Sequence, residues 1–168
     1  MSALVIQPIE ASNVESFHQA LDAVARERRY LSMLEAPPLD RLQDFVAGLK
    51  QSNNPQFVAL DGARVVGWCD IRRHDRELHA HRGVLGMGII DGYRGAGLGK
   101  RLIEPPLAAS WAIGLHRVEL DAHADNDRAI RLYESVGFVR EGVARDAVRI
   151  DGRFVDVIHM AIIRSNTA

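Results

Sequence analysis

At the start of the chain, the spacing of the apolar residues changes within a few positions. Leu4 to Ile9 is a short apolar run that predicts a strand. Ser12 and Glu15 have the spacing of a capping box, so a helix is expected to begin there. Its apolar positions fall three or four residues apart, at Val14, Phe17, Leu21 and Val24. The pattern therefore predicts a strand followed by an amphipathic helix.

A second helix and a hairpin come next. Pro37-Pro38 interrupts the chain, and Asp40 is expected to cap a helix with an apolar side formed by Leu42, Phe45, Val46 and Leu49. Beyond it, Gln56–Leu60 and Arg64–Arg72 flank Asp61-Gly62. Because Asp-Gly accepts the positive backbone angles of a tight turn, these two runs are predicted to form a hairpin.

The second half of the chain also mixes strand and helix patterns. A strand is expected from about Val84 to Ile90, and a helix from Leu98 to Leu115. Pro105-Pro106 would remove hydrogen bonds inside that helix, so a kink or an early end is expected. The remaining predicted elements are a strand over Arg117–Asp121, a helix capped by Asp125 or Asn126 and ending near Val136, and two strands flanking Asp151-Gly152.

Composition and charge limit the class of protein. A chain of 168 residues with 47% hydrophobic residues can bury a core, and one domain over residues 1–168 is expected. The 21 basic and 22 acidic residues nearly balance, and aromatic residues are 6%, which argues against nucleic-acid and membrane partners. Cys69 is the only cysteine, and there is no signal-like or membrane-spanning apolar run. A cytoplasmic location is therefore expected.

A glycine-rich turn lies between the predicted strand and helix around residue 95. It contains Arg94, Gly95, Ala96, Gly97, Leu98, Gly99 and Lys100. Glycines let the backbone turn tightly and approach a ligand, and the first N–H groups of the following helix point at negative charge. Arg94, Lys100 and Arg101 add positive charge locally. The segment is typical of an anion site, although a plain tight helix N-terminus would use the same glycines.

The spacing of the glycines argues against two better-known phosphate loops. A nucleoside-triphosphate loop needs a longer gap before Gly-Lys and then Ser or Thr, whereas Arg101 follows Gly99-Lys100. A dinucleotide loop needs G-x-G-x-x-G, whereas Gly95, Gly97 and Gly99 alternate strictly. Neither cofactor is expected here.

Two motifs in this order resemble those of the GCN5-related N-acetyltransferases. Arg94 to Gly99 is similar to the signature R/Q-x-x-G-x-G/A, placed after a strand and before a helix. Asn126 followed by Ala129 to Phe138 is similar to the second signature, an asparagine and then A-I-x-L-Y-x-x-x-G-F. The closing segment resembles the bacterial branch that includes small-molecule and amino-acid acetyltransferases. The resemblance is strong over roughly residues 83 to 163.

This resemblance implies an α/β (α+β) fold with a mixed, mostly antiparallel sheet of about seven strands and about four flanking helices. The strands that hold Ile89 and Val118 would run parallel and splay apart. The implied cosubstrate is acetyl-coenzyme A, with its pyrophosphate on the glycine turn. Main-chain groups of Gly88, Ile89 and Ile90 would bond its pantetheine arm like an added strand, and an N–H near Ile89 or Ile90 would meet the oxyanion.

The resemblance also implies roles for two side chains. Tyr133 would be the general acid, with its hydroxyl at the helix start facing the sulfur, since a phenol can protonate a thiolate of comparable basicity. Packing beside Leu132 and Phe138 is compatible with that role. Asn126 would cap its helix and bond the pantetheine arm or a water, and capping alone stays open.

The general base is not identified by the sequence. Glu77, His79 and His81 precede the central strand and could accept the amine proton directly or through water. His74, His79 and His81 also suggest a metal, but they have no defined ligand frame, so no metal is assigned.

The acceptor side is expected to come from the first two helices and the final hairpin. Glu27 and Tyr30 lie in a charged segment between those helices and are weak substrate candidates, since such a run is more often a solvated helix face. The sequence thus predicts transfer of an acetyl group to a primary amine of a small molecule such as an amino acid, a polyamine or an amine-bearing antibiotic or toxin. The alternatives are a protein N-terminus or lysine as acceptor, and a non-catalytic acetyl-coenzyme A sensor. A homodimer through the final hairpin is compatible with the sequence.

Overall fold

The computed structural model describes residues 3–165. The longer elements, in chain order, are β1 (Val5–Pro8), α1 (Val14–Ala25), α2 (Leu39–Gln51), β2 (Gln56–Asp61), β3 (Arg64–Arg73), β4 (Arg82–Ile89), α3 (Leu98–Ala112), β5 (Arg117–His123), α4 (Asp127–Val136), β6 (Val139–Ile150) and β7 (Arg153–Ile163). Short 3-10 turns, η1 (Ala11–Asn13) and η2 (Glu77–His79), precede α1 and β4.

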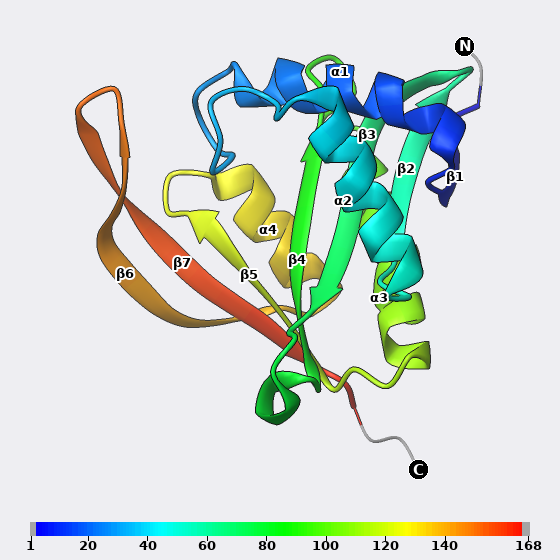
Figure 1. The fold of residues 1–168 in the computed structure, drawn as a ribbon. Coiled ribbons are helices and arrows are strands. Elements are labelled where there is room, and N and C mark those ends of the chain that lie inside the picture. The colour runs from blue at the N-terminus through cyan, green and yellow to red at the C-terminus, as the bar shows by residue number, and fades with distance from the viewer. Residues whose placement is uncertain (1–2, 166–168) are drawn as a thin grey trace.

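All seven strands form one sheet in the order β1-β2-β3-β4-β5-β7-β6. Helices α1 and α2 lie on one face, and α3 and α4 lie on the other (Figure 1). Phe17 of α1 packs on Trp68 of β3 with ring centroids 5.4 Å apart. The face of β3 that holds Trp68, Asp70 and Arg72 is therefore the one that α1 covers. The strands β6 and β7 extend beyond the helices as a two-stranded arm (Figure 1). This is the mixed, mostly antiparallel sheet that the family resemblance implies.

The central strands β4 and β5 run parallel and separate along their length (Figure 1). They pair only at their beginnings, through Arg82 with Arg117, Gly83 with Val118 and Val84 with Glu119. β4 continues to pair with β3 up to Ile89, and β5 continues to pair with β7 up to His123. The expected splay is therefore confirmed, and the gap opens toward the carboxyl ends of both strands.

Two predicted helix caps are wrong. Ser12 lies inside η1, which is capped by Glu10 and Asn13, and α1 begins at Val14 without a side-chain cap. Asp40 is already inside the first turn of α2 and accepts only from the N–H of Arg41. The short 3-10 turn η1 leads into α1, and Pro38 is the N-cap of α2, which also begins without a side-chain cap.

Helix α3 contains both prolines without ending there. Pro105 and Pro106 lie inside it, and it stops at Ala112, three residues before the predicted end. Pro106 is buried against the sheet, so tertiary packing offsets the hydrogen bonds that the rings remove. Gly99 in its first turn lets α4 approach closely, since a Cβ there would be 2.7 Å from Leu132.

The apolar residues of the final hairpin mostly fill the core. Val155, Val157 and Ile158 are buried, whereas Ile163 is 49% exposed. The hairpin pattern is thus explained largely by packing within this chain. None of the helices within residues 3–165 is long and apolar enough to cross a membrane.

A buried carboxyl on β3 makes stability depend on pH. Asp70 is 6% exposed, and burial raises its pKa from 3.8 to about 7, partly offset by Arg72 at 3.7 Å. Between about pH 4 and 7 the folded state keeps a proton that the unfolded state has lost, so stability falls as pH rises. The free energy of unfolding should fall by at most about 1.4 kcal/mol per pH unit in this range. Asp70→Asn should remove this pH dependence, and it should stabilise the protein most above pH 7. Urea unfolding of both proteins at several pH values tests this, and a difference that does not change with pH would contradict it.

Candidate active site

The backbone of β4 presents alternate residues to the gap. The N–H of Ile90 donates to the carbonyl of Val66 on β3 at 3.0 Å. Because bonding alternates along an antiparallel ladder, Gly88 and Gly86 also bond β3, whereas Ile89 and Met87 face away from it toward β5. Of the three residues expected to bond a pantetheine arm, only Ile89 therefore offers its N–H to the gap. Met87 is a second such residue that the sequence analysis did not single out.

The glycine turn at the end of β4 is shaped for an anionic group. Gly92, Gly95 and Gly97 have φ of 86°, 81° and 78°, which few other residues adopt without strain. Nothing lies within 4 Å of a Cβ placed on Gly95 or Gly97. Gly97 is the N-cap of α3, so the N–H groups of the next residues have no acceptor within the helix. These features fit the pyrophosphate of a coenzyme.

The guanidinium of Arg94 forms hydrogen bonds with other groups of the protein. Its Nε donates to the carbonyl of Ile89 at 2.7 Å, and its two terminal nitrogens donate to both carboxylate oxygens of Glu27 at 3.0 and 2.6 Å. Lys100 lies exposed in the first turn of α3, and Arg101 donates to the carbonyl of Leu4. The turn thus joins the end of β4 to the segment after α1.

Tyr133 lies behind β4 on the face of α3 and α4. It is 8% exposed, its ring packs 5.8 Å from that of Phe138, and burial, assisted by the nearby Cys69, raises its pKa. Cys69 pairs with Met87 in the β3–β4 ladder, so Tyr133 stands at the level where Met87 faces the gap. A phenol with a raised pKa stays protonated and can donate.

Asn126 and Tyr133 lie on the same helix, α4. Asn126 is the N-cap of α4 and accepts from the N–H of Ala129 at 3.3 Å, so the predicted cap is confirmed. Tyr133 comes seven residues later, about two turns from the helix start. Helical side chains lean toward the N-terminus, which brings the hydroxyl back toward that end.

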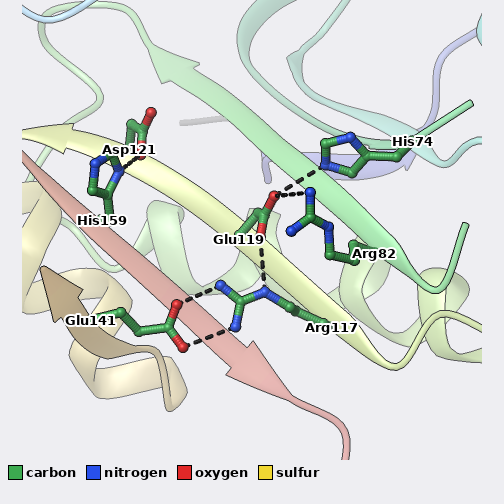
Figure 2. A network of polar contacts seen from close by, with 7 residues as sticks. All are labelled: His74, Arg82, Arg117, Glu119, Asp121, Glu141 and His159. Carbon is green, nitrogen blue, oxygen red and sulfur yellow. Dashed lines mark hydrogen bonds and ion pairs between the residues drawn. The ribbon is translucent and has the colours of Figure 1, made fainter. Parts of the chain in front are cut away.

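Charged side chains cover the opposite face of β4 and β5 (Figure 2). Arg117 donates to Glu119 at 2.8 Å and binds both oxygens of Glu141. His74 lies 3.0 Å from Glu119, and Arg82 lies 3.8 Å from it. Burial opposes the charge of Glu119, but the hydrogen bonds from Arg117 and His74 outweigh it and lower its pKa. Both carboxylates are therefore committed to Arg117.

A second pair on this face is Asp121 with His159, whose Nδ1 is in contact with the Asp121 carboxylate (Figure 2). Their side chains are 65% and 49% exposed. Both line a cavity of about 490 Å³ whose walls also include Val84, Glu119 and Glu141. Unlike Glu119 and Glu141, Asp121 has no arginine partner within residues 3–165. Sequence reasoning missed this pair, because only the pairing of β5 with β7 brings its two members together.

The proposed base candidates lie at the wrong end of β4. Glu77 and His79 are in η2, and His81 directly precedes the strand, whereas the glycine turn follows its far end. Eight residues of strand separate the two ends, which is about 26 Å. These side chains therefore do not face the gap. Residues 3–165 contain no group of three or more His, Cys, Asp or Glu that could hold a metal ion.

The weak substrate candidates do lie at the open end of the gap. Glu27 binds Arg94, and the ring of Tyr30 packs edge-on against His123 at the end of β5, 6.1 Å between centroids. His123 in turn bonds the carbonyl of Arg29 at 2.8 Å. The charged segment after α1 is thus bonded to the ends of both central strands, although Arg28 and Arg29 remain exposed.

Two known N-acetyltransferases are similar to this chain in sequence. The N-alpha-acetyltransferase RimI of Mycobacterium tuberculosis is 36% identical over 104 residues, which are 62% of this chain and 64% of that protein. The L-amino acid N-acetyltransferase AaaT of Escherichia coli is 28% identical over 171 residues, covering 98% of this chain and 100% of that protein.

Solved structures and a family model agree with the fold. The structure of yncA from Salmonella typhimurium, described as a putative acetyltransferase with its cofactor acetyl-CoA, superposes with a TM-score of 0.92 at 15% identity, covering 99% of this chain and 97% of that one. The model of the acetyltransferase (GNAT) family matches residues 17–138, which hold the glycine turn, the gap and Tyr133. The chain therefore belongs to the GNAT family of acetyltransferases.

Proposed function

We propose that this protein transfers the acetyl group of acetyl-coenzyme A to a primary amine of a small molecule, in one N-acetyltransferase domain formed by residues 1–168. The observation that carries the proposal is the gap between β4 and β5. It has a turn shaped for an anion at its open end and a buried phenol on one face. On the other face an open polar cavity lies beside it, lined mainly by residues of β5, β6 and β7.

The coenzyme supplies the acetyl group as a thioester. On the protein side, Gly95 to Lys100 would hold its pyrophosphate through backbone N–H groups and the start of α3. Met87 and Ile89 would bond its arm, as an added strand bonds an edge. One of these two N–H groups would bond the thioester carbonyl at the end of the arm and polarise it, because the N–H of Ile90 already donates to Val66.

Proton transfers on the two sides of the sheet would use different groups. Asp121 and His159 face the cavity from which an amine enters, and together they can take the proton that the amine must lose. Tyr133, on the opposite face, can give a proton to the departing sulfur. Asn126 would bond the arm with the part of its amide that does not cap α4.

The acceptor is proposed to be a small amine for two reasons. AaaT, which matches over its full length, is named for acetylating L-amino acids. The cavity of about 490 Å³ is of the size that holds a small ligand. Acetylation of a protein N-terminus, as in the name of RimI, is the second candidate, and its support is the 36% identity over 104 residues. A cytoplasmic setting fits the single, buried Cys69.

Thermal shift with acetyl-coenzyme A, followed by a thiol-release screen, tests this proposal. A coenzyme that binds the folded state at 100 times its Kd should add about 2.7 kcal/mol of stability. ATP and NAD serve as controls, because the turn lacks both of their loop patterns. Thiol release should then appear with one class among amino acids, polyamines, aminoglycosides and peptides. An equal shift with ATP, or no shift with acetyl-coenzyme A, would exclude the proposed donor, and binding without any release would favour the sensor.

A further inference from the structure

Four consecutive residues after α1 contact three separate elements at the open end of the gap. Glu27 binds Arg94 of the glycine turn, and Arg28 binds Asp151 of the β6–β7 turn at 2.5 Å. The carbonyl of Arg29 and the ring of Tyr30 both contact His123 at the end of β5. We call residues 27–30 the crossing segment. It contacts the same face of the sheet as Asp121. The reason is that Asp121 and His123 are two residues apart on β5, so their side chains point to the same side.

The ion pair of this segment with the glycine turn is more buried than its ion pair with the β6–β7 turn. The Glu27 and Arg94 side chains are 26% and 23% exposed, against 60% and 45% for Asp151 and Arg28. The bond is bidentate, and the third nitrogen of Arg94 holds the carbonyl of Ile89. Each of the three nitrogens of this guanidinium thus donates to a group of the protein itself.

We infer that Glu27 and Arg94 form a positioning pair that fixes the crossing segment against the end of β4, so that Arg94 does not act as a phosphate ligand. The inference rests on the proposed function and assigns a role within it. Arg94 fixes the carbonyl of Ile89, whose N–H faces the gap, and Glu27 fixes the segment that borders the acceptor side. The Arg94 side chain thereby fixes the position of the donor side of the site relative to the acceptor side.

The pair requires an arginine for a geometric reason. A guanidinium is a planar fork that can serve two carboxylate oxygens and a carbonyl at once, whereas a lysine ammonium is a point charge. A phosphate ligand needs the charge more than the fork. Lysine at position 94 therefore separates the two roles.

The test measures coenzyme affinity and acceptor kcat/KM in Arg94→Gln, Arg94→Lys, Glu27→Gln and the double Gln variant. Each single variant should lower acceptor kcat/KM about tenfold, and the double variant should lose no more than either single one. The Kd for coenzyme A should change less than about threefold in each. Arg140→Gln, which breaks the exposed pair with Glu134, is the control and should leave both quantities unchanged.

Two results would overturn the inference. One is a loss of coenzyme affinity of about tenfold in Arg94→Gln with wild-type affinity in Arg94→Lys and Glu27→Gln, which is the pattern of a phosphate ligand. The other is independent of activity: hydrogen exchange of amides 27–30 that stays at the wild-type rate in both single variants. Faster exchange in both supports the pair even if no acceptor is found, whereas absence of coenzyme binding in the wild type refutes only the proposed function.

Discussion

Tyr133→Phe is expected to lower kcat by about 100-fold or more, because it removes the only atom of the side chain that can give a proton to the departing sulfur. The ring is 8% exposed and packs on Phe138, so phenylalanine fits the same space and the fold is retained. The Kd for acetyl-coenzyme A should stay the same, since the change affects a step after binding. Stopped-flow or steady-state thiol release with the acceptor from the screen measures this.

Asp121→Asn provides the comparison on the opposite face of the sheet. It also keeps the fold, since the Asp121 side chain is 65% exposed, but it should lower kcat/KM for the acceptor by weakening proton removal from the amine. Raising the pH should recover part of this loss, because more of the amine is then uncharged, and should not recover Tyr133→Phe. Unchanged kcat in Tyr133→Phe would remove Tyr133 from the mechanism and leave it as a core residue.

Gly88→Ala is expected to be the most damaging of the small substitutions in β4. A Cβ at this position would lie 2.3 and 2.5 Å from ring atoms of Trp68, distances that no real contact shows. Trp68 is 4% exposed and packs on Phe17, so it has no open space to move into. Overpacking of this kind costs about 1–3 kcal/mol, and the displaced indole would also disturb the strand that borders the gap. Urea unfolding and acetyl-coenzyme A binding both measure the effect.

Gly86→Ala is the matched control, two residues earlier on the same strand and the same face. Its Cβ would lie 3.7 Å from the Asp70 carboxylate, which is an ordinary contact. It should change the free energy of unfolding by about 0.5 kcal/mol or less. Equal stability of the two variants would show that Trp68 does not set the requirement for glycine at position 88.

Local sequence patterns predicted the helices, strands and turns well, but they predicted the first residues of the helices poorly. The turn at Asp151-Gly152 was predicted from residue type, and both residues have positive φ in the structure, because that requirement is local. The caps at Ser12 and Asp40 were wrong because the helices begin later and earlier than expected, at Val14 after η1 and at Leu39 after Pro38. Pro105 and Pro106 remained inside α3 because burial against the sheet outweighed the lost bonds.

The candidate site was predictable on its donor side and not on its acceptor side. The glycine turn and Tyr133 lie in contiguous motifs, so their spacing could be compared with the family pattern. The pairs Asp121 with His159 and Glu27 with Arg94 join residues 38 and 67 positions apart, and no local spacing contains them. The sequence pattern therefore offered base candidates only before β4, and Glu77 and His79 lie at the wrong end of that strand.

By itself the sequence determined the order of strands and helices, the turn that fits an anion and the family resemblance, because each depends on residues within one short window. Only the tertiary structure decided which backbone groups of β4 face the gap, what Arg94 bonds and which carboxylate borders the cavity. These depend on register between strands and on side chains brought together from distant positions. Strand register is set by the packing of the whole sheet, so a one-residue shift would turn every side chain of β4 to the other face.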